Sequence, residues 1–112
     1  PSGMRRYEKH PNAATLDQII EFTLTEFSKI GAENKFVLLQ YSETEVVEPS
    51  SDLLKIKDQT ILLAKKKNIT VIDTSDELKR RRNSSKEPIW YGHHTPYGNS
   101  LVCNEILQHL RD

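Results

Sequence analysis

Apolar residues recur along this chain with helical spacing in some segments and form short uninterrupted runs in others. Between residues 15 and 30 they return every three or four positions, at Leu16, Ile19, Ile20, Leu24, Phe27 and Ile30. This spacing gathers them on one face of a helix, and Gly31 supplies a stop. Residues 36–39 form a continuous apolar run, which is consistent with a strand covered on both faces.

A second helix and a second strand are predicted in the middle of the chain. Residues 41–49 form a polar connection, after which Ser50 or Ser51 caps a helix that ends at the lysines 65–67. Cations in a last helical turn interact favourably with the helix dipole. Residues 69–72 are rich in β-branched side chains and predict a strand that ends at Asp73.

Helical and extended segments alternate again toward the C-terminus. A short helix over residues 75–82 is followed by a loop over 83–88 and by an extended segment over 89–91, which leads into a pair of histidines. The apolar-periodic run over 101–110 predicts a final helix.

The order of these elements predicts an α/β fold. A strand, a helical crossover of roughly twenty residues and a second strand make a βαβ unit, in which the strands are parallel and the crossover is right-handed. With 112 residues the chain is one small domain or a portion of one. We assign residues 13–112 to this α/β domain and the polar residues 1–12 to an arm or linker.

Two strands are few for such a fold. A two-stranded sheet is only marginally stable, and parallel strands need helices on both faces and further neighbouring strands. We therefore expect additional strands from another chain, from a missing N-terminal part or from a partner copy. The alternative is a small two-layer domain with further weak strands, for example around residues 45–47.

Charge and composition narrow the range of partners. Sixteen basic residues balance sixteen acidic ones, whereas proteins that bind duplex nucleic acid usually show a basic excess, so no nucleic-acid partner is predicted. The longest apolar runs, of about four residues, are far too short for a membrane span. The single cysteine, Cys103, occupies an apolar position of the last helix, which predicts a small core residue. No signal peptide is visible, and the compartment stays open.

His93 and His94 stand directly before the last predicted helix. Thr95 is a good N-cap, and Pro96 suits the first helical position because its missing N–H is not needed there. We therefore expect a loop that holds the histidines on a rigid element, where functional groups are often presented. Imidazole exchanges protons near neutral pH, so a histidine at this place is a candidate general base.

The same segment carries a family resemblance. It reads Trp90-Tyr91-Gly92-His93-His94-Thr95-Pro96-Tyr97-Gly98-Asn99. Its Gly-His and Thr-Pro-x-Gly-Asn parts resemble the last conserved block of the SGNH (GDSL-type) hydrolases. By this resemblance His93 takes the position of the catalytic histidine, and the chain is part of a three-layer α/β/α domain with a short parallel sheet, similar to flavodoxin-like folds. An ester or acyl compound is the implied substrate, and no cofactor is implied.

The sequence departs from the family pattern at two places. The family usually has an aspartate two or three residues before the histidine, and that position holds Tyr91, whose hydroxyl forms hydrogen bonds but carries no charge near neutral pH. The family's nucleophile belongs to a Gly-Asp-Ser block near the N-terminus of the domain, and this chain has no such block. The nucleophile would therefore come from outside the chain, and we expect the isolated chain to be inactive.

Other residues near the histidines are candidates for binding or support. His94 is expected to be exposed or supporting, and Trp90 and Tyr97 either line a substrate pocket or pack under the loop. Asp73 ends a parallel strand at the edge where α/β proteins bind ligands, and its alternative role is to cap the following helix. The basic run 79–82 is typical of a solvated helix end, and no metal-ligand spacing is present.

Three functional hypotheses remain after these observations. In the first, the chain is the histidine-bearing part of an SGNH-type ester hydrolase. In the second, it is a non-catalytic relative that keeps the fold as a binding or interaction module. In the third, it is an unrelated small α/β interaction domain.

Overall fold

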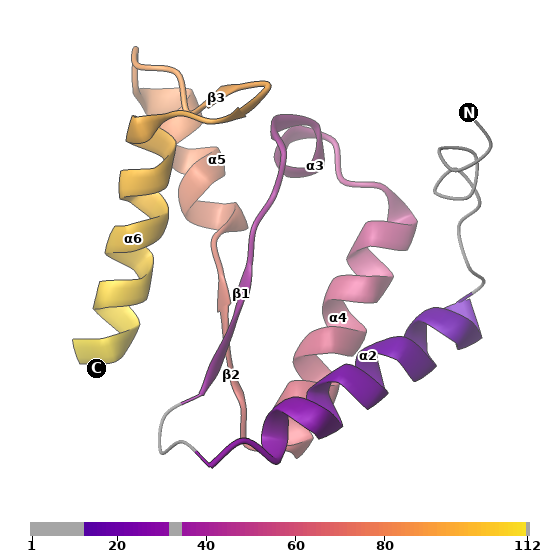
Figure 1. Ribbon diagram of the computed structural model, residues 1–112. Helices are drawn as coiled ribbons and strands as arrows, with labels where there is room; N and C mark the ends of the chain where they lie inside the picture. The colour runs from indigo at the N-terminus through magenta and orange to yellow at the C-terminus, as the bar shows by residue number, and fades with distance from the viewer. Residues whose placement is uncertain (1–12, 32–34, 112) are drawn as a thin grey trace, which may run out of the picture.

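The structure, a computed structural model, describes residues 13–31 and 35–111 (Figure 1). Helices and a two-stranded parallel sheet alternate along the chain, which agrees with the predicted α/β class. In chain order the elements are α2 (Ala13–Ser28), β1 (Phe36–Leu39), α3 (Glu43–Val47), α4 (Ser51–Lys66), β2 (Thr70–Asp73), α5 (Ser75–Ser84), β3 (Trp90–Tyr91), β4 (His93–His94) and α6 (Pro96–Arg111). The predicted polar arm, residues 1–12, lies outside the described residues.

The short helix α3 is the element that the apolar pattern did not indicate. The Ser42 side chain accepts a hydrogen bond from the Glu45 N–H (3.3 Å), and the Glu45 carboxylate accepts one from the Ser42 N–H (2.8 Å). This reciprocal pair satisfies N–H groups that a helix start leaves free. Val46 is the buried residue of α3. The alternative of a weak strand around residues 45–47 is therefore wrong.

The starts of the two longer C-terminal helices follow the capping chemistry that the sequence indicated. The Ser50 side chain accepts a hydrogen bond from the Leu53 N–H (3.1 Å) at the start of α4. The Thr95 hydroxyl oxygen accepts one from the Gly98 N–H (3.1 Å) at the start of α6. Both predicted helix starts are confirmed, because each side chain satisfies an N–H group with no partner inside its helix.

The parallel pairing of the two strands is also confirmed. The register runs from Phe36 opposite Thr70 to Leu39 opposite Asp73, with α4 in the connection between the strands. Asn68 has a φ of 57° at the turn from α4 into β2. Asparagine tolerates this left-handed conformation better than most residues, so it suits a sharp exit from the helix.

The histidines lie in a small hairpin, so the predicted loop is wrong in this detail. β3 and β4 pair antiparallel, with Trp90 opposite His94 and Tyr91 opposite His93. Gly92 makes the turn with a φ of 76°, a conformation that favours glycine. The extended lead-in expected over residues 89–91 thus folds back onto the histidines, and the pairing orders both.

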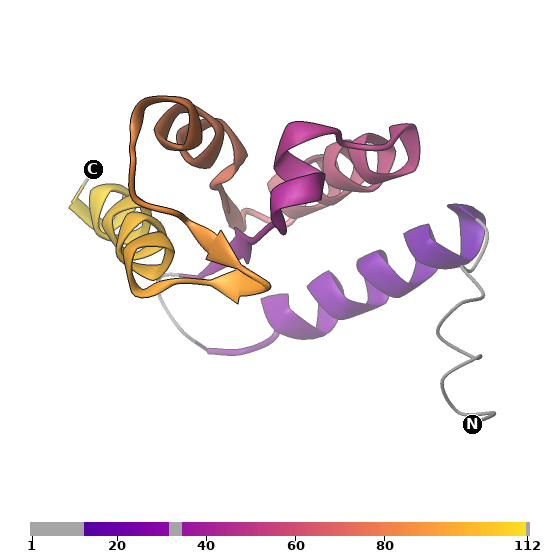
Figure 2. The ribbon, with the colours of Figure 1, turned by 90° about the horizontal axis from the view of Figure 1, so that it is seen from above.

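Two buried apolar clusters hold the helices to the sheet. The first joins α3, α5, α6 and the segment before the hairpin, through Tyr41, Val46, Leu78, Ile89, Leu101 and Val102. The second joins α2, α4 and the residue before β2, through Leu24, Leu63, Ala64 and Ile69. Figure 2 shows α5 and α6 on one side of the β1–β2 pair and α4 with α2 on the other.

Much apolar surface stays uncovered. Within the described residues, β1 and β2 pair with each other and with no further strand, so each has an open edge. All four residues of β1 are half-buried, although an uninterrupted apolar run is typical of an interior strand. Large apolar side chains are also exposed on α2, α3, α4 and α6, namely Ile19, Phe22, Val47, Leu54, Leu62, Leu107 and Leu110.

Helix α6 approaches the segment before the hairpin very closely at Gly98. A Cβ atom on Gly98 would lie less than 3.0 Å from the carbonyl oxygen of Ile89. That oxygen also accepts hydrogen bonds from the N–H and the hydroxyl of Thr95 (2.9 and 3.1 Å). Its position is therefore constrained, and glycine is required for the helix to pack here.

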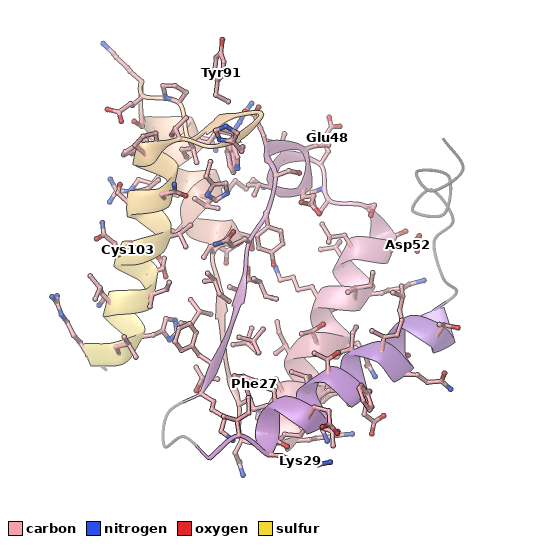
Figure 3. The ribbon with its side chains drawn as sticks, viewed as in Figure 1. Phe27, Lys29, Glu48, Asp52, Tyr91 and Cys103 are labelled. Atoms are coloured by element: carbon pink, nitrogen blue, oxygen red, sulfur yellow. The ribbon has the colours of Figure 1, made fainter. Side chains whose placement is uncertain are left out.

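Cys103 departs from its predicted place in the core. It is exposed on the outer face of α6 (Figure 3), whereas Leu101 and Val102 form the buried face. The orientation of α6 against the first apolar cluster decides which of its residues are buried. The apolar run in the sequence does not determine this orientation.

We expect Gly98→Ala to destabilise the fold by about 1–3 kcal/mol, because the added methyl group would push α6 away from the Ile89 carbonyl. Urea denaturation followed by circular dichroism measures this difference. The control is Gly31→Ala, where an added Cβ meets nothing within 4 Å, and we expect it to change stability by less than about 0.5 kcal/mol. Equal effects of the two substitutions would contradict the close packing at Gly98.

Candidate functional site

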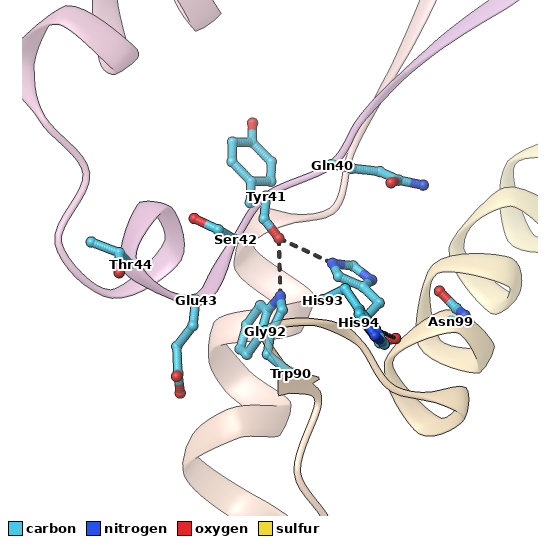
Figure 4. A pocket seen from close by; sticks show the side chains of 10 residues that line it. All are labelled: Gln40, Tyr41, Ser42, Glu43, Thr44, Trp90, Gly92, His93, His94 and Asn99. Carbon is cyan, nitrogen blue, oxygen red and sulfur yellow. Dashed lines mark hydrogen bonds between the residues drawn. The ribbon is translucent and has the colours of Figure 1, made fainter. Parts of the chain in front are cut away.

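A pocket of about 680 Å³ lies at the carboxyl end of β1, where the hairpin and the first turn of α6 meet the chain that follows the strand (Figure 4). It is lined by Gln40, Tyr41, Ser42, Glu43, Thr44, Trp90, Gly92, His93, His94 and Asn99. The histidines thus lie beside the end of β1, as expected for a site at the carboxyl edge of parallel strands.

The ring of His93 is exposed, and one of its nitrogens has a defined partner. Its Nδ1 lies 3.0 Å from the carbonyl oxygen of His94. A carbonyl oxygen is only an acceptor, so this hydrogen bond requires a proton on Nδ1. In the neutral ring the lone pair is then on Nε2, which is the arrangement that a general base needs.

The ring of His94 points inward and is held on the chain after β1. Its Nε2 lies 3.0 Å from the carbonyl oxygen of Tyr41, and the indole N–H of Trp90 donates to the same oxygen at 3.0 Å (Figure 4). The Trp90 and His94 rings meet edge to face, with centroids 5.9 Å apart and an angle of 85°. Both side chains therefore fasten the hairpin to β1, and the supporting alternative for His94 fits this geometry.

Tyr91 does not support His93. It is 81% exposed and points away from the rest of the protein (Figure 3). Among the described residues, the Tyr91 hydroxyl makes no hydrogen bond to the His93 ring, which is held by the backbone carbonyl of His94 instead. Tyr91 and His93 are thus neighbours in the hairpin, but the Tyr91 side chain does not orient the His93 ring.

The hydroxyl groups of Ser42 and Thr95 are engaged elsewhere. Ser42 lines the pocket, but its hydroxyl oxygen is the N-cap acceptor of α3, and Figure 4 shows it directed away from the histidines. Thr95 uses its hydroxyl on the carbonyl oxygens of Pro88 (2.7 Å) and Ile89. Among residues 13–31 and 35–111, no serine or threonine hydroxyl is hydrogen-bonded to His93.

Asp73 lies at the end of β2 and combines two structural roles rather than lining the pocket. Its carboxylate is 2.7 Å from the Lys57 ammonium group and accepts a hydrogen bond from the Ser75 N–H (3.0 Å) at the start of α5. Burial alone would raise the pKa of this carboxyl group, but the hydrogen bonds from Lys57 and Ser75 outweigh it and hold the pKa below its ordinary value. The cap alternative thus describes Asp73 better than a binding role does.

Tyr41 connects this ion pair with the hairpin, and the sequence did not single it out. Its carbonyl oxygen faces Trp90 and His94, whereas its hydroxyl points to the opposite side of the backbone (Figure 4). The Lys57 ammonium group lies 5.9 Å from the centre of its ring. Burial of the hydroxyl, together with the nearby Asp73 carboxylate, raises its pKa. An aromatic residue two positions after an apolar strand was the available signal.

The remaining predicted groups fall outside the pocket. Arg80 and Arg81 pair with Glu77 (both 2.8 Å), and Arg82 pairs with Glu43 (2.9 Å), so these cations have acidic partners on the surface. Within the described residues, no cluster of three or more histidine, cysteine, aspartate or glutamate side chains is placed to hold a metal ion. Over the same residues, no helix combines the length and the apolar character needed to cross a membrane.

In comparisons with known proteins, no family model, no curated protein and no solved structure matches this chain.

We expect Asp73→Asn to lower stability by about 2 kcal/mol at neutral pH, because the half-buried Lys57 loses a charged partner. A carboxyl group whose pKa is lowered in the fold stabilises it above its unfolded-state pKa, and this contribution is lost as the pH falls through the folded-state value. The difference between wild type and variant, measured by urea denaturation, should therefore shrink in acid. Glu26→Gln, in the exposed pair with Lys29, is the control, with an expected effect below about 0.5 kcal/mol. A difference for Asp73→Asn that is independent of pH would contradict the assignment.

Proposed function

We propose that this chain is the histidine-bearing part of an SGNH-type hydrolase domain that acts on ester or acyl substrates, with His93 as the general base. The observation that carries the proposal is the state of the His93 ring. It is exposed beside a pocket at the carboxyl end of β1, its Nδ1 is held by a backbone carbonyl, and its Nε2 is left to accept a proton. The resemblance of residues 90–99 to the last block of the family supports the same role.

In the proposed reaction, a serine hydroxyl supplied from outside these residues attacks the carbonyl carbon of the substrate. His93 Nε2 takes the hydroxyl proton and then passes it to the alcohol as that group departs. The serine oxygen now carries the acyl group, so an acyl-enzyme has formed. In the second half, His93 Nε2 takes a proton from water as the water oxygen attacks the acyl carbon. The bond between that carbon and the serine oxygen then breaks, the serine oxygen takes the proton from His93, and the carboxylic acid is released. The His94 carbonyl oxygen stabilises the protonated ring through the Nδ1–H, as the aspartate does in the family, but without a full negative charge.

The proposed architecture is the C-terminal part of a three-layer α/β/α domain whose sheet is completed by another chain or by a preceding part of the same protein. Helices on both sides of the β1–β2 pair, an apolar but half-buried β1 and its open edge support this proposal. Added strands would also bring further residues to the carboxyl edge, where the pocket lies.

The second candidate is a non-catalytic α/β module that binds a ligand or a protein with the same surface. Two observations favour it, namely the exposed Tyr91 at the aspartate position and the engagement of Ser42 in the cap of α3. In this case the pocket keeps its polar lining, and His93 acts as a hydrogen-bonding group.

We expect the isolated 112-residue chain to release no p-nitrophenol from p-nitrophenyl acetate above the background rate, because one member of the catalytic group is missing. A polypeptide that joins this chain to a segment with a serine nucleophile should hydrolyse the ester. There His93→Ala should lower kcat/KM by about 10⁴-fold or more, and His109→Ala, on the exposed last turn of α6, should not change it. Hydrolysis that His93→Ala leaves intact would exclude His93 as the base, and an inactive joined polypeptide would favour the binding module.

We also expect the isolated chain to associate in a concentration-dependent manner, because open strand edges and exposed apolar side chains favour contact between copies. Sedimentation velocity over a dilution series measures this. Phe22→Glu, which places a charge at a 67% exposed position of α2, should reduce association, whereas Tyr91→Ser, at the tip of the hairpin, should not. A monomer at all concentrations with a single cooperative melting transition would argue for a self-sufficient small domain.

A further inference from the structure

The carbonyl oxygen of Tyr41 is the acceptor at which the hairpin is fastened to the sheet. It receives two N–H groups, one from the Trp90 indole and one from the His94 ring, each at 3.0 Å. A carbonyl oxygen has two lone pairs, so both are used here. Tyr41 is itself 7% exposed. The acceptor is therefore held by a buried residue, and we call these three residues the Tyr41 anchor.

The Tyr41 anchor determines the tautomer of His94. Because the carbonyl cannot donate, the His94 proton must be on Nε2. Its Nδ1 is buried and has no hydrogen-bond partner among the described residues, so a second proton there would be buried without an acceptor. The neutral Nε2–H form is thus the one that fits the anchor.

The backbone carbonyl of His94 connects the anchored ring of His94 with the ring of His93. The same residue whose ring is fixed at Tyr41 supplies the carbonyl oxygen that holds the His93 Nδ1–H. The peptide group that carries this carbonyl is also restrained by the Thr95 N–H, which donates to the Ile89 carbonyl oxygen (2.9 Å), and by the pairing of His94 with Trp90. The anchored ring adds to these restraints because it fixes the side of His94 that faces Tyr41. A hydrogen-bonded backbone thereby replaces the carboxylate that is absent at Tyr91.

We propose that Trp90 and His94 are positioning residues, which act through the Tyr41 carbonyl to fix the tautomer and orientation of His93, and that they do not bind substrate through their ring nitrogens. This inference rests on the proposed function, because it describes how the proposed base is held. It also predicts that two adjacent histidines carry their protons on opposite nitrogens, Nδ1 in His93 and Nε2 in His94.

Nitrogen-15 NMR of the imidazole rings, in the full chain well above neutral pH, tests the proposal without a substrate. In the wild type we expect the Nδ1–H form of His93 and the Nε2–H form of His94. Trp90→Phe and His94→Phe keep aromatic rings but remove one anchor N–H each, and each should shift the His93 tautomer ratio by roughly fivefold toward that of an unrestrained imidazole. The matched control is Tyr91→Phe, which removes an exposed hydroxyl from the same hairpin and should leave the ratio unchanged.

The outcomes separate this proposal from the proposed function. If His93 keeps its Nδ1–H form in both anchor variants while their circular dichroism stays native, the positioning role is wrong and the orientation of the base stands. If His93 carries its proton on Nε2 in the wild type, the proposed base is itself misassigned. The wild-type spectrum also provides a test that needs no variant, because an Nδ1–H form of His94 would exclude the anchor.

Discussion

The parallel pairing of β1 with β2 is the constraint from which most of this structure follows. Parallel neighbours need a crossover, and α4 provides it between the two strands. The same pairing brings the carboxyl ends of both strands to one edge, so that Tyr41 and Asp73 stand close together there. Helices gather on both sides because strand faces rich in apolar side chains must be covered. The pocket and the Lys57–Asp73 ion pair therefore both lie where the carboxyl ends of the two strands come together.

At the carboxyl ends of the strands, polar groups lie on two sides of Tyr41. Lys57, Asp73 and Ser75 form a partly buried network beside the ring of Tyr41. The backbone carbonyl of Tyr41 serves the hairpin on the other side. The position of the hairpin thus depends on how firmly the chain after β1 is packed. The segment that carries the hairpin is also held from the other end, because Ile89 is buried in the first apolar cluster and its carbonyl oxygen accepts the Thr95 N–H.

The candidate base shows how a carboxylate-free histidine can still be oriented. In a catalytic triad an acidic residue holds the ring and stabilises its positive charge. The His94 carbonyl reproduces the first effect at His93 by geometry and the second only through its dipole. Electrostatic stabilisation by a dipole is weaker than that by a full charge at the same distance. A protonated His93 ring would therefore be stabilised less than the ring of a triad histidine.

Local sequence determined the elements and their ends. Apolar spacing indicated α2, α4 and α6, apolar runs indicated β1 and β2, and Ser50 and Thr95 marked helix starts, because these features depend on interactions within a few residues. There are two exceptions. Helix α3 lacks enough apolar residues for a pattern and begins at the capping pair of Ser42 and Glu45, and the β3–β4 hairpin replaces a predicted extended segment and loop. The topology of parallel strands also predicts the histidines beside the carboxyl ends of both strands, and the pocket that they line lies at the end of β1 and takes no residue from β2.

Only the tertiary structure decided which groups meet. The contact between Tyr41 and His94 spans 53 positions of the chain, and no local rule relates an aromatic residue after a strand to a ring in a distant hairpin. The exposure of Tyr91 and Cys103 depends on how the hairpin and α6 are rotated against the core. Hydrogen-bond partners and tautomers require distances of about 3 Å between such segments. Sequence periodicity determines the buried faces and the ends of helices and strands. The packing of these elements sets the hydrogen-bond distances between distant segments.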